Sequence, residues 1–322
     1  MFFVKYPEIV IVEMGVDRVG DMDYLMSIVR PNISVLTSVA YAHSEFFDDI
    51  EQIAKEKQKI ISYMKEGGTA IINYDDKYVR SAMKSTKKRI ITYGTSEKAD
   101  FIATDIDICF HQCHATGLSF KLNYKGKIIP VRLNNIIAKH FIYATLAGLV
   151  VADVVDINIV DVVGGIANFE GSPGRMRLLE GRNASTVIDD TYNASPSAMK
   201  AALETLDDAP GSRKIVALGD MRELGKVSED EHKSIAKQLQ RMNIDQIFLV
   251  GKEMKVVYKI LNDTKMTVKH YDNVDEVGDD VRDSVHSGDV VLVKGSRGIK
   301  LEKIVATLVE DKAKTLCVKC NN

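Results

Sequence analysis

The sequence predicts an α/β protein with a mostly parallel sheet in its first half and a doubly wound, Rossmann-like unit in its second. Short apolar runs recur along the chain with helix-period segments between them, an alternation typical of parallel sheets. The punctuation Gly171-Ser172-Pro173-Gly174 interrupts this alternation, which restarts after it. With 322 residues, 45% of them hydrophobic, the chain can bury two cores. We therefore expect domains at 1–171 and 172–312 and a tail at 313–322.

The elements of the first half follow from period and punctuation. Strands are predicted at Ile9–Val12, Ile33–Leu36, Ala70–Ile72 and Ile90–Tyr93, and helices at Asp21–Val29, Asp48–Met64, Ile137–Val151 and Ile157–Ala167. Between Asp100 and Leu133 the period changes to two, with turns expected at Thr116-Gly117 and Lys125-Gly126. This stretch predicts antiparallel strands added to the sheet or flanking it.

In the second half, strands are predicted at Thr186–Ile188, Lys214–Leu218, Gln246–Val250, Thr267–Tyr271 and Val290–Val293. Ser195 followed by Pro196 is a helix start, because serine caps the free amides and proline suits the first helical position. Ser228, with Glu231 three residues later, predicts a capping box for another helix.

Charge, hydropathy and cysteine usage exclude several classes of protein. The net charge of −2 and the lack of a long basic block argue against nucleic acid or an anionic membrane as partner. No apolar run approaches the roughly 20 residues of a membrane span, and the start reads as a strand and not as a signal peptide. Four unevenly spaced cysteines favour a reducing cytoplasm over a disulfide framework, and a cysteine metal site is disfavoured. We expect a cytoplasmic monomer.

Residues 186–196 are the strongest functional candidate. Asp189 and Asp190 end an apolar strand, where open α/β sheets bind ligands, and Tyr192 and Asn193 follow them. An ordinary strand-to-helix loop with solvated acids is an equally good interpretation of this segment alone.

Three residues of the first half could gather at a sheet edge. Glu13 ends a predicted strand and offers an oxygen ligand for a hard metal ion, and His43 follows the next strand. Taken singly, both are more often structural. Lys57 lies near the centre of the apolar stripe of its helix, so it must snorkel, pair with an acid, or have its charge changed by burial or chemistry.

Two further loops carry charge after strands of the second half. Residues 219–225 place Asp220, Met221, Arg222, Glu223 and Leu224 between two glycines. The loop carries both charges, which suits a small zwitterion, although such loops can also be hinges. Lys294, Ser296 and Arg297 supply two cations and a hydroxyl among exposed amides, which favours an anion site over a solvated turn.

Together these elements resemble the Mur ligases of peptidoglycan synthesis, over about residues 8–310. The most specific matches are Gly174-Arg175-Met176-Arg177, the segment from Asp189 to Pro196, Leu218-Gly219-Asp220-Met221 with Glu223-Leu224-Gly225, and Lys294-Gly295-Ser296-Arg297-Gly298. The combination is most similar to the branch that adds a dipeptide, D-alanyl-D-alanine, to UDP-N-acetylmuramoyl-tripeptide.

The resemblance implies an ATP-driven amide bond, formed through an acyl phosphate that the dipeptide amine attacks. It implies Mg²⁺ held by Glu13, His43 and Lys57, the lysine being carbamylated. It also implies that His140, Arg175, Asp190, Tyr192 and Asn193 meet the nucleotide. The loops with Asp220, Met221, Glu223, Leu224, Lys294, Ser296 and Arg297 would then grip the dipeptide and the nearby phosphate.

Departures from the family pattern qualify this expectation. The family begins with a substrate-binding domain and a Gly-x-Gly-Lys-Thr phosphate loop, and neither is present in this sequence. We therefore expect an incomplete central ATPase domain that is inactive by itself. Ser38 stands where the family usually has asparagine, Gln58-Lys59 where it has Gly-Glu, and Phe141 and Ala144 replace two adenine-side asparagines. The alternative to an enzyme is a non-catalytic protein that binds nucleotide or dipeptide and scaffolds or regulates cell-wall synthesis.

Overall fold

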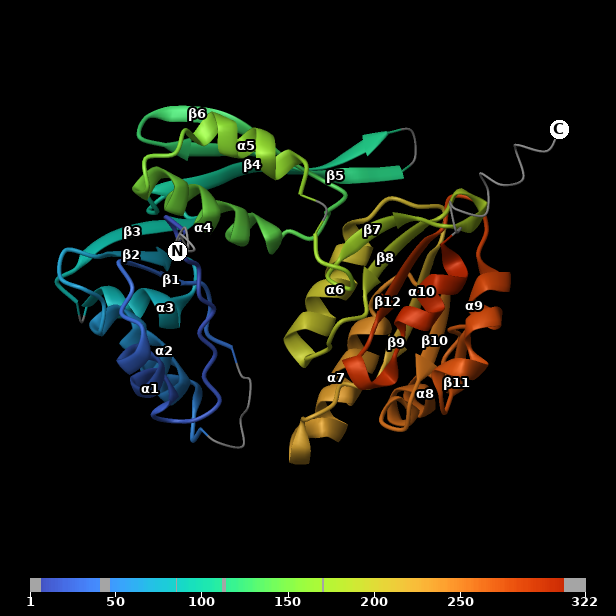
Figure 1. The fold of residues 1–322 in the computed structure, drawn as a ribbon. Helices are drawn as coiled ribbons and strands as arrows, with labels where there is room; N and C mark the ends of the chain where they lie inside the picture. The colour runs from blue at the N-terminus through green and yellow to red at the C-terminus, as the bar shows by residue number, and fades with distance from the viewer. Residues whose placement is uncertain (1–6, 41–46, 85, 112–113, 170, 310–322) are drawn as a thin grey trace, which may run out of the picture. The chain divides into compact units, whose positions relative to one another are not determined.

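The computed structural model describes residues 7–40, 47–84, 86–111, 114–169 and 171–309 (Figure 1). By internal contacts the chain divides into two compact units, Met1–Ile102 with Tyr143–Ile157 and Ala103–Ile142 with Asn158–Asn322. The domain limits at 171 and 312 stay a prediction. Within the described ranges no helix has the length and apolar character needed to cross a membrane.

The first sheet has the strand order β1-β2-β3-β4-β5-β6. Its strands are β1 (Ile33–Leu36), β2 (Thr69–Asn73), β3 (Arg89–Gly94), β4 (Phe101–His111), β5 (His114–Tyr124) and β6 (Lys127–Asn134). The pairs β1–β2, β2–β3 and β3–β4 are parallel, whereas β5 and β6 are antiparallel. The predicted change from parallel to antiparallel strands near residue 100 is confirmed.

Among its described residues, this half of the chain forms the α-helices α1 (Asp21–Ile28), α2 (Ile50–Ser62), α3 (Lys77–Ser81), α4 (Phe141–Val154) and α5 (Ile159–Ala167). Side-chain caps fix the starts of two of them. The Asp49 carboxylate accepts the Gln52 N–H at 2.7 Å at the start of α2, and Asp76 caps α3. The apolar side of α2 then packs with α1, β1 and β2 in one core cluster.

The second sheet has the order β11-β10-β9-β12-β8-β7. Its strands are β7 (Arg177–Glu180), β8 (Thr186–Asp190), β9 (Lys214–Gly219), β10 (Gln246–Val250), β11 (Val268–Tyr271) and β12 (Val290–Lys294). All neighbours are parallel except β7, which runs antiparallel to β8. Five of these strands are confirmed predictions; β7 was not predicted.

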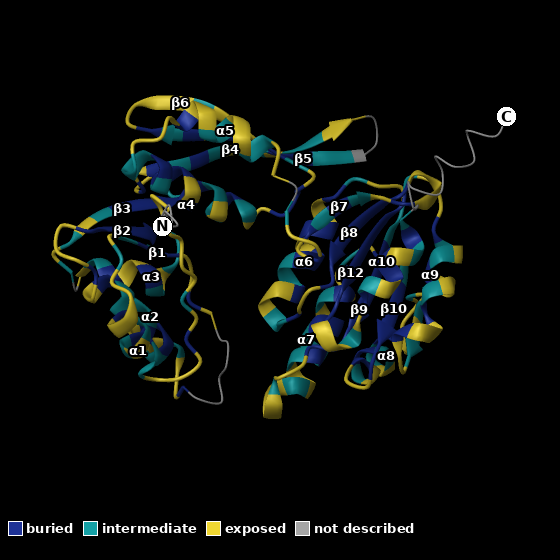
Figure 2. Ribbon diagram, in the orientation of Figure 1, coloured by how far each residue is buried: buried dark blue, intermediate teal, exposed yellow. Residues whose placement is uncertain are grey.

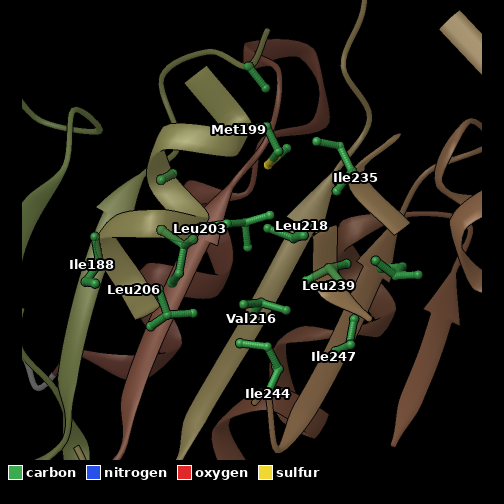
Figure 3. Close-up of a cluster of buried hydrophobic side chains, with 14 of the residues drawn as sticks. Ile188, Met199, Leu203, Leu206, Val216, Leu218, Ile235, Leu239, Ile244 and Ile247 are labelled. Carbon is green, nitrogen blue, oxygen red and sulfur yellow. The ribbon is translucent and has the colours of Figure 1, made fainter. Parts of the chain in front are cut away.

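Helices cover both faces of this sheet, which confirms the doubly wound class. They are α6 (Pro196–Asp208), α7 (Ser228–Leu239), α8 (Met254–Asn262), α9 (Gly278–Ser284) and α10 (Glu302–Leu308). Val216 and Leu218 of β9 join the cluster with α6, α7 and α8 (Figure 3). Ile215 and Ala217 join the opposite cluster, with α9 and α10. Because successive strand residues face opposite ways, both faces must be apolar, and the central strands β9, β10 and β12 are buried along nearly their whole length (Figure 2).

The strand predicted at Ile9–Val12 is wrong. Residues 7–16 form no strand, and the four apolar side chains are between 50% and 89% exposed. A strand exists only where a neighbour completes its hydrogen-bond ladder, and no strand of the described ranges pairs with this segment. Apolar composition alone therefore predicted an element that tertiary pairing does not form.

Two local predictions also fail for identifiable reasons. Gly117 lies inside β5 and not in a turn; a Cβ there would stand 2.1 Å from the Leu133 carbonyl oxygen, so glycine permits close strand approach. The capping box is absent, because Val227 is the N-cap of α7 and makes no side-chain bond. The Ser228 hydroxyl instead donates to Glu253 at 2.9 Å.

The charged residue that α2 buries is Glu56, which is 2% exposed, whereas Lys57 is half-buried. Glu56 accepts the backbone N–H groups of Gly20 and Met22 at 3.0 and 2.9 Å, and its other oxygen pairs with Lys59 at 2.7 Å. It thus supplies a carboxylate to the free amides at the start of α1.

Glu56→Ala should lower the free energy of unfolding by about 2 kcal/mol, because two amides lose their acceptor. Chemical denaturation measures this change, and hydrogen exchange should become faster at the start of α1. Glu51→Ala, an exposed acid on the same helix, is the matched control and should change little. Equal stability of the two variants would contradict the prediction.

Candidate functional site

Three loops leave the same edge of the C-terminal sheet, because β8, β12 and β9 are parallel neighbours. Ser296 joins these loops. Its N–H donates to the Asp220 carbonyl at 3.0 Å, and its Oγ accepts the Arg222 N–H at 2.9 Å and donates to the Ala194 carbonyl at 3.4 Å. Ser296 is 4% exposed, so the hydroxyl predicted to touch a ligand ties the loops together instead.

Asp189 and Asp190 are buried within β8 rather than solvated beyond its end. Asp189 accepts the Gly174 N–H at 3.1 Å and the Thr191 hydroxyl at 2.7 Å. Asp190 accepts the Met176 N–H at 3.1 Å. The two carboxylates therefore fasten residues 174–176 to the strand, as buried acceptors must be satisfied. The solvated-acid interpretation is wrong for both.

Lys294 lies beneath the loops and not on their surface. It is 2% exposed, and its Nζ pairs with the Asp190 carboxylate at 2.5 Å and donates to the Asn193 carbonyl at 2.9 Å. Two opposite charges buried together neutralise each other, so Lys294 is not a free cation for an incoming anion. Its role in the site is to hold Asp190 and the 193 turn in place.

Two cations that do face solvent flank an aromatic ring. The Arg175 guanidinium stacks over the Tyr192 ring at 4.1 Å from its centroid, and the Arg297 guanidinium lies 6.0 Å from the same centroid. All three residues are exposed. Gly174 makes this possible, since its φ of +72° is left-handed and a Cβ would stand 2.9 Å from the Tyr192 nitrogen. This arrangement can bind a phosphate or a planar ring.

His140 and Asn193 are exposed, and His140 lies within the electrostatic reach of the Asp190–Lys294 pair. Protein packed around His140 lowers the pKa of its imidazole; the Asp190 carboxylate opposes this shift and the Lys294 ammonium adds to it. The ring is therefore biased towards the neutral form, which can both donate and accept a hydrogen bond. Asn193 uses its side-chain oxygen to accept the Ala194 N–H at 2.8 Å.

The 219–225 loop turns its first residues inwards and its later ones outwards. Asp220 is 6% exposed and Met221 is 1% exposed, whereas Leu224 is half-buried and Glu223 is exposed in a left-handed conformation. The Asp220 carboxylate accepts the Met254 N–H at 2.9 Å at the start of α8. Asp220 is therefore occupied as a helix acceptor, and Glu223 is the acid of this loop that a ligand amine can reach.

Burial raises the pKa of Asp220, and its bonds to the Met254 and Glu253 backbone oppose the shift. A carboxyl with a raised pKa binds its proton more tightly in the folded state than in the unfolded state. The free energy of unfolding therefore falls as pH rises from the unfolded pKa, about 3.9, through the folded pKa. Asp220→Asn should thus stay within about 1 kcal/mol of wild type at pH 7, because the amide oxygen still accepts. Urea unfolding near pH 4 and pH 7 checks this. A stability gain for wild type on going from pH 4 to 7, relative to Asn, would contradict it.

In the N-terminal unit, Lys57 donates to the Ser38 carbonyl at 3.3 Å. Burial lowers the pKa of Lys57, and the Asp76 carboxylate opposes the shift. Asp76 also accepts the Val39 N–H at 2.8 Å, so it positions the segment that follows β1. Glu13 is exposed and follows no strand, which overturns the reason for expecting it at the sheet edge. His43 lies outside the described residues.

These residues fit a divalent cation only in part. Across the part of the chain that the structure describes, no three His, Cys, Asp or Glu side chains group as metal ligands. Lys57 fits carbamylation, since a lowered pKa favours the neutral amine that reacts with carbon dioxide. Its carbonyl neighbour and the Asp76 carboxylate would surround that group with oxygen atoms.

Sequence reasoning missed His232, and it treated Arg222 only as part of the charged 219–225 loop. His232 accepts the Met221 N–H, and the Arg222 guanidinium lies over Gly298, where a Cβ would stand 2.1 Å from it. His232 stands on the apolar side of α7 with Ile235 and Leu239, and a histidine at such a position is the only sequence signal that was available.

The chain matches two protein families and several curated proteins. Residues 2–152 match the Mur ligase middle domain, and residues 174–297 match the Mur ligase glutamate ligase domain. A protein of Rickettsia prowazekii named UDP-N-acetylmuramoyl-tripeptide--D-alanyl-D-alanine ligase is 32% identical over 302 residues, which are 92% of this chain and 66% of the relative. A Bacillus subtilis protein of the same name is 30% identical, over 94% and 65%. The chain thus spans about two thirds of these relatives.

Solved structures of Mur ligases are also similar to this chain. MurF from Acinetobacter baumannii superimposes with a TM-score of 0.79 at 26% identity, over 91% of this chain and 63% of that one. MurF ligase from Thermotoga maritima in complex with ADP gives a TM-score of 0.78 at 26% identity, over 91% and 65%.

Proposed function

Because the chain belongs to the Mur ligase family, we propose that it carries the catalytic and amino-acid-binding parts of an ATP-dependent amide ligase. The proposed reaction joins D-alanyl-D-alanine to UDP-N-acetylmuramoyl-tripeptide, the reaction for which the similar proteins are named. The observation that supports it most strongly is the set of three loops at one edge of the C-terminal sheet, tied together by Ser296.

In the proposed reaction, a carboxylate oxygen of the tripeptide takes the γ-phosphoryl group of ATP, and ADP leaves. The dipeptide amine then attacks the acyl carbon, loses a proton, and phosphate leaves with its oxygen. Arg175 and Arg297 offer exposed charge for the phosphate. The similar MurF ligase from T. maritima is a complex with ADP, which supports the use of ATP. Tyr192, Asn193 and His140 border the nucleotide.

For the second substrate, the exposed Glu223 faces the positive amine of the dipeptide, and the exposed Arg222 faces its carboxylate. The buried residues Asp220, Met221, Lys294 and Ser296 fix the shape of the loops. This division follows from burial, because a side chain with all its polar atoms paired inside cannot also hold a ligand.

ATP and Mg²⁺ are the proposed cofactors. Lys57 would hold Mg²⁺ as its carbamate, together with His43; the cation, when bound, neutralises phosphate charge. The lowered pKa of Lys57 supports this role. Glu13 is kept as a third ligand on the family resemblance alone. The monomeric state and the cytoplasmic location stay predictions.

A coupled phosphate-release assay tests the proposal. It compares this chain with a protein extended upstream by the part that the relatives possess, each with ATP, Mg²⁺, UDP-N-acetylmuramoyl-tripeptide and D-alanyl-D-alanine. Turnover by the extended protein alone supports the proposed roles. Turnover by the short chain would refute the expectation that it is inactive by itself. No turnover by either, with dipeptide or nucleotide still bound, would favour a non-catalytic binding protein.

A further inference from the structure

Three successive amides of the 219–225 loop each have a defined acceptor. Asp220 N–H donates to the Val250 carbonyl at 3.2 Å, and Arg222 N–H donates to the Ser296 hydroxyl at 2.9 Å. The amide between them, Met221 N–H, donates to Nε2 of His232 at 3.2 Å. The middle amide is thus the one of the three that an imidazole ring holds.

The bonds of His232 fix its protonation state. Its side chain is fully buried in α7, and Nδ1 lies 2.7 Å from the Ser228 carbonyl oxygen. A carbonyl oxygen can only accept, so Nδ1 carries the proton, and Nε2 must be bare to accept from Met221. The ring is therefore neutral, with one tautomer selected by two backbone groups.

The loop needs this support because its later part is strained. Glu223, which carries a side chain, has a left-handed φ of +64°. This conformation costs a non-glycine residue free energy, which bonds elsewhere in the loop must offset. Met221 is 1% exposed, so its amide has no ready access to water if the ring is removed.

We propose that His232 is a positioning residue for the 219–225 loop. Its neutral imidazole accepts the Met221 N–H, and this hydrogen bond, which we call the latch, keeps Glu223 and Arg222 exposed to solvent. The role at the dipeptide rests on the proposed function, whereas the latch itself does not. His232 touches no ligand in this scheme; it acts through the backbone of the loop.

Two variants separate the latch from simple core filling. In His232→Gln, the side-chain oxygen can reach the place of Nε2 and accept from Met221. In His232→Asn, the shorter amide can reach only the place of Nδ1 and donate to Ser228. Both variants replace the buried ring by a smaller side chain. If His232 only filled space in the core, both should therefore change the 219–225 loop to a similar degree. His111→Asn, at an exposed histidine of β4, is the control.

Hydrogen exchange on this chain, without ligand, measures the latch. We expect the 219–225 amides to exchange about tenfold faster in His232→Asn and within about twofold of wild type in His232→Gln, once rates are referred to each variant's global stability. Equal acceleration in both variants, or in neither, would overturn the proposal.

Titration with D-alanyl-D-alanine, followed by NMR in the same three proteins, tests the link to the ligand. Binding weakened about tenfold in His232→Asn and retained in His232→Gln supports it. If wild type binds but both variants bind alike, the positioning role is refuted. If wild type does not bind while exchange still separates the variants, the latch stands and the proposed function of the loop fails.

Discussion

Lys57→Ala should abolish turnover in the extended, active protein and leave its fold intact. Lys57 is half-buried, donates to the Ser38 carbonyl, and has its pKa lowered by burial. If its carbamate holds the cation that neutralises phosphate charge, removing the side chain removes that ligand. A loss of about 10³-fold or more in kcat is expected for a lost metal ligand.

Two further measurements distinguish a carbamate ligand from a general effect of shortening the Lys57 side chain. A short carboxylic acid added to Lys57→Ala should restore part of the activity, since its oxygens can occupy the space of the carbamate. Mass spectrometry under native conditions should find the mass of one carbon dioxide on wild type and not on the variant. Lys55→Ala, at an exposed position of α2, is the control and should keep full activity. Full activity of Lys57→Ala would refute the carbamate assignment.

Lys294→Ala should lower the free energy of unfolding by about 3–5 kcal/mol, the cost of leaving a buried charge without its partner. Asp190 would lose its counter-ion, and the Asn193 carbonyl its donor. The loops over the site should loosen as well, because the 193 turn is held from below.

Denaturant unfolding measures the loss, and a double-mutant cycle with Asp190→Asn isolates the pair, since the coupled change should cost less than the sum. The control is Lys233→Ala. Lys233 pairs with Glu229 at 2.7 Å on the exposed surface of α7, where such pairs contribute about 0.3–0.5 kcal/mol. Similar losses at both lysines would mean that the buried pair is not the source of the stability.

Most strands of the C-terminal sheet could be predicted because strands that are buried on both faces need apolar residues. β9, β10 and β12 are nearly continuous apolar runs, as strands covered on both faces must be, and β8 carries a shorter apolar run before Asp189 and Asp190. Each prediction fell within about two residues of the structure. β7 was missed because Arg177–Glu180 alternates weakly and becomes a strand only through pairing with β8. Ile9–Val12 fails for the opposite reason, since its composition suits a strand but nothing described pairs with it.

The candidate loops were placed by the same logic, because residues that follow parallel strands meet at one edge. The sequence located Asp190, Asp220 and Lys294 at that edge but not their tasks. All three were expected to face a ligand, and all three are buried and paired. Glu223, Arg175 and Arg297 remain exposed, as expected.

The sequence by itself determined the α/β class, the two parallel-dominated sheets, the family and the edge at which the polar loops gather. The tertiary structure alone decided which charged side chains are buried and paired and which stay exposed. Lys294 meets Asp190 from 104 positions away, and Asp220 caps a helix 34 positions on. Apolar periodicity is a local property that each element carries in its own residues, whereas the partner of a buried charge is chosen by the packing of distant segments.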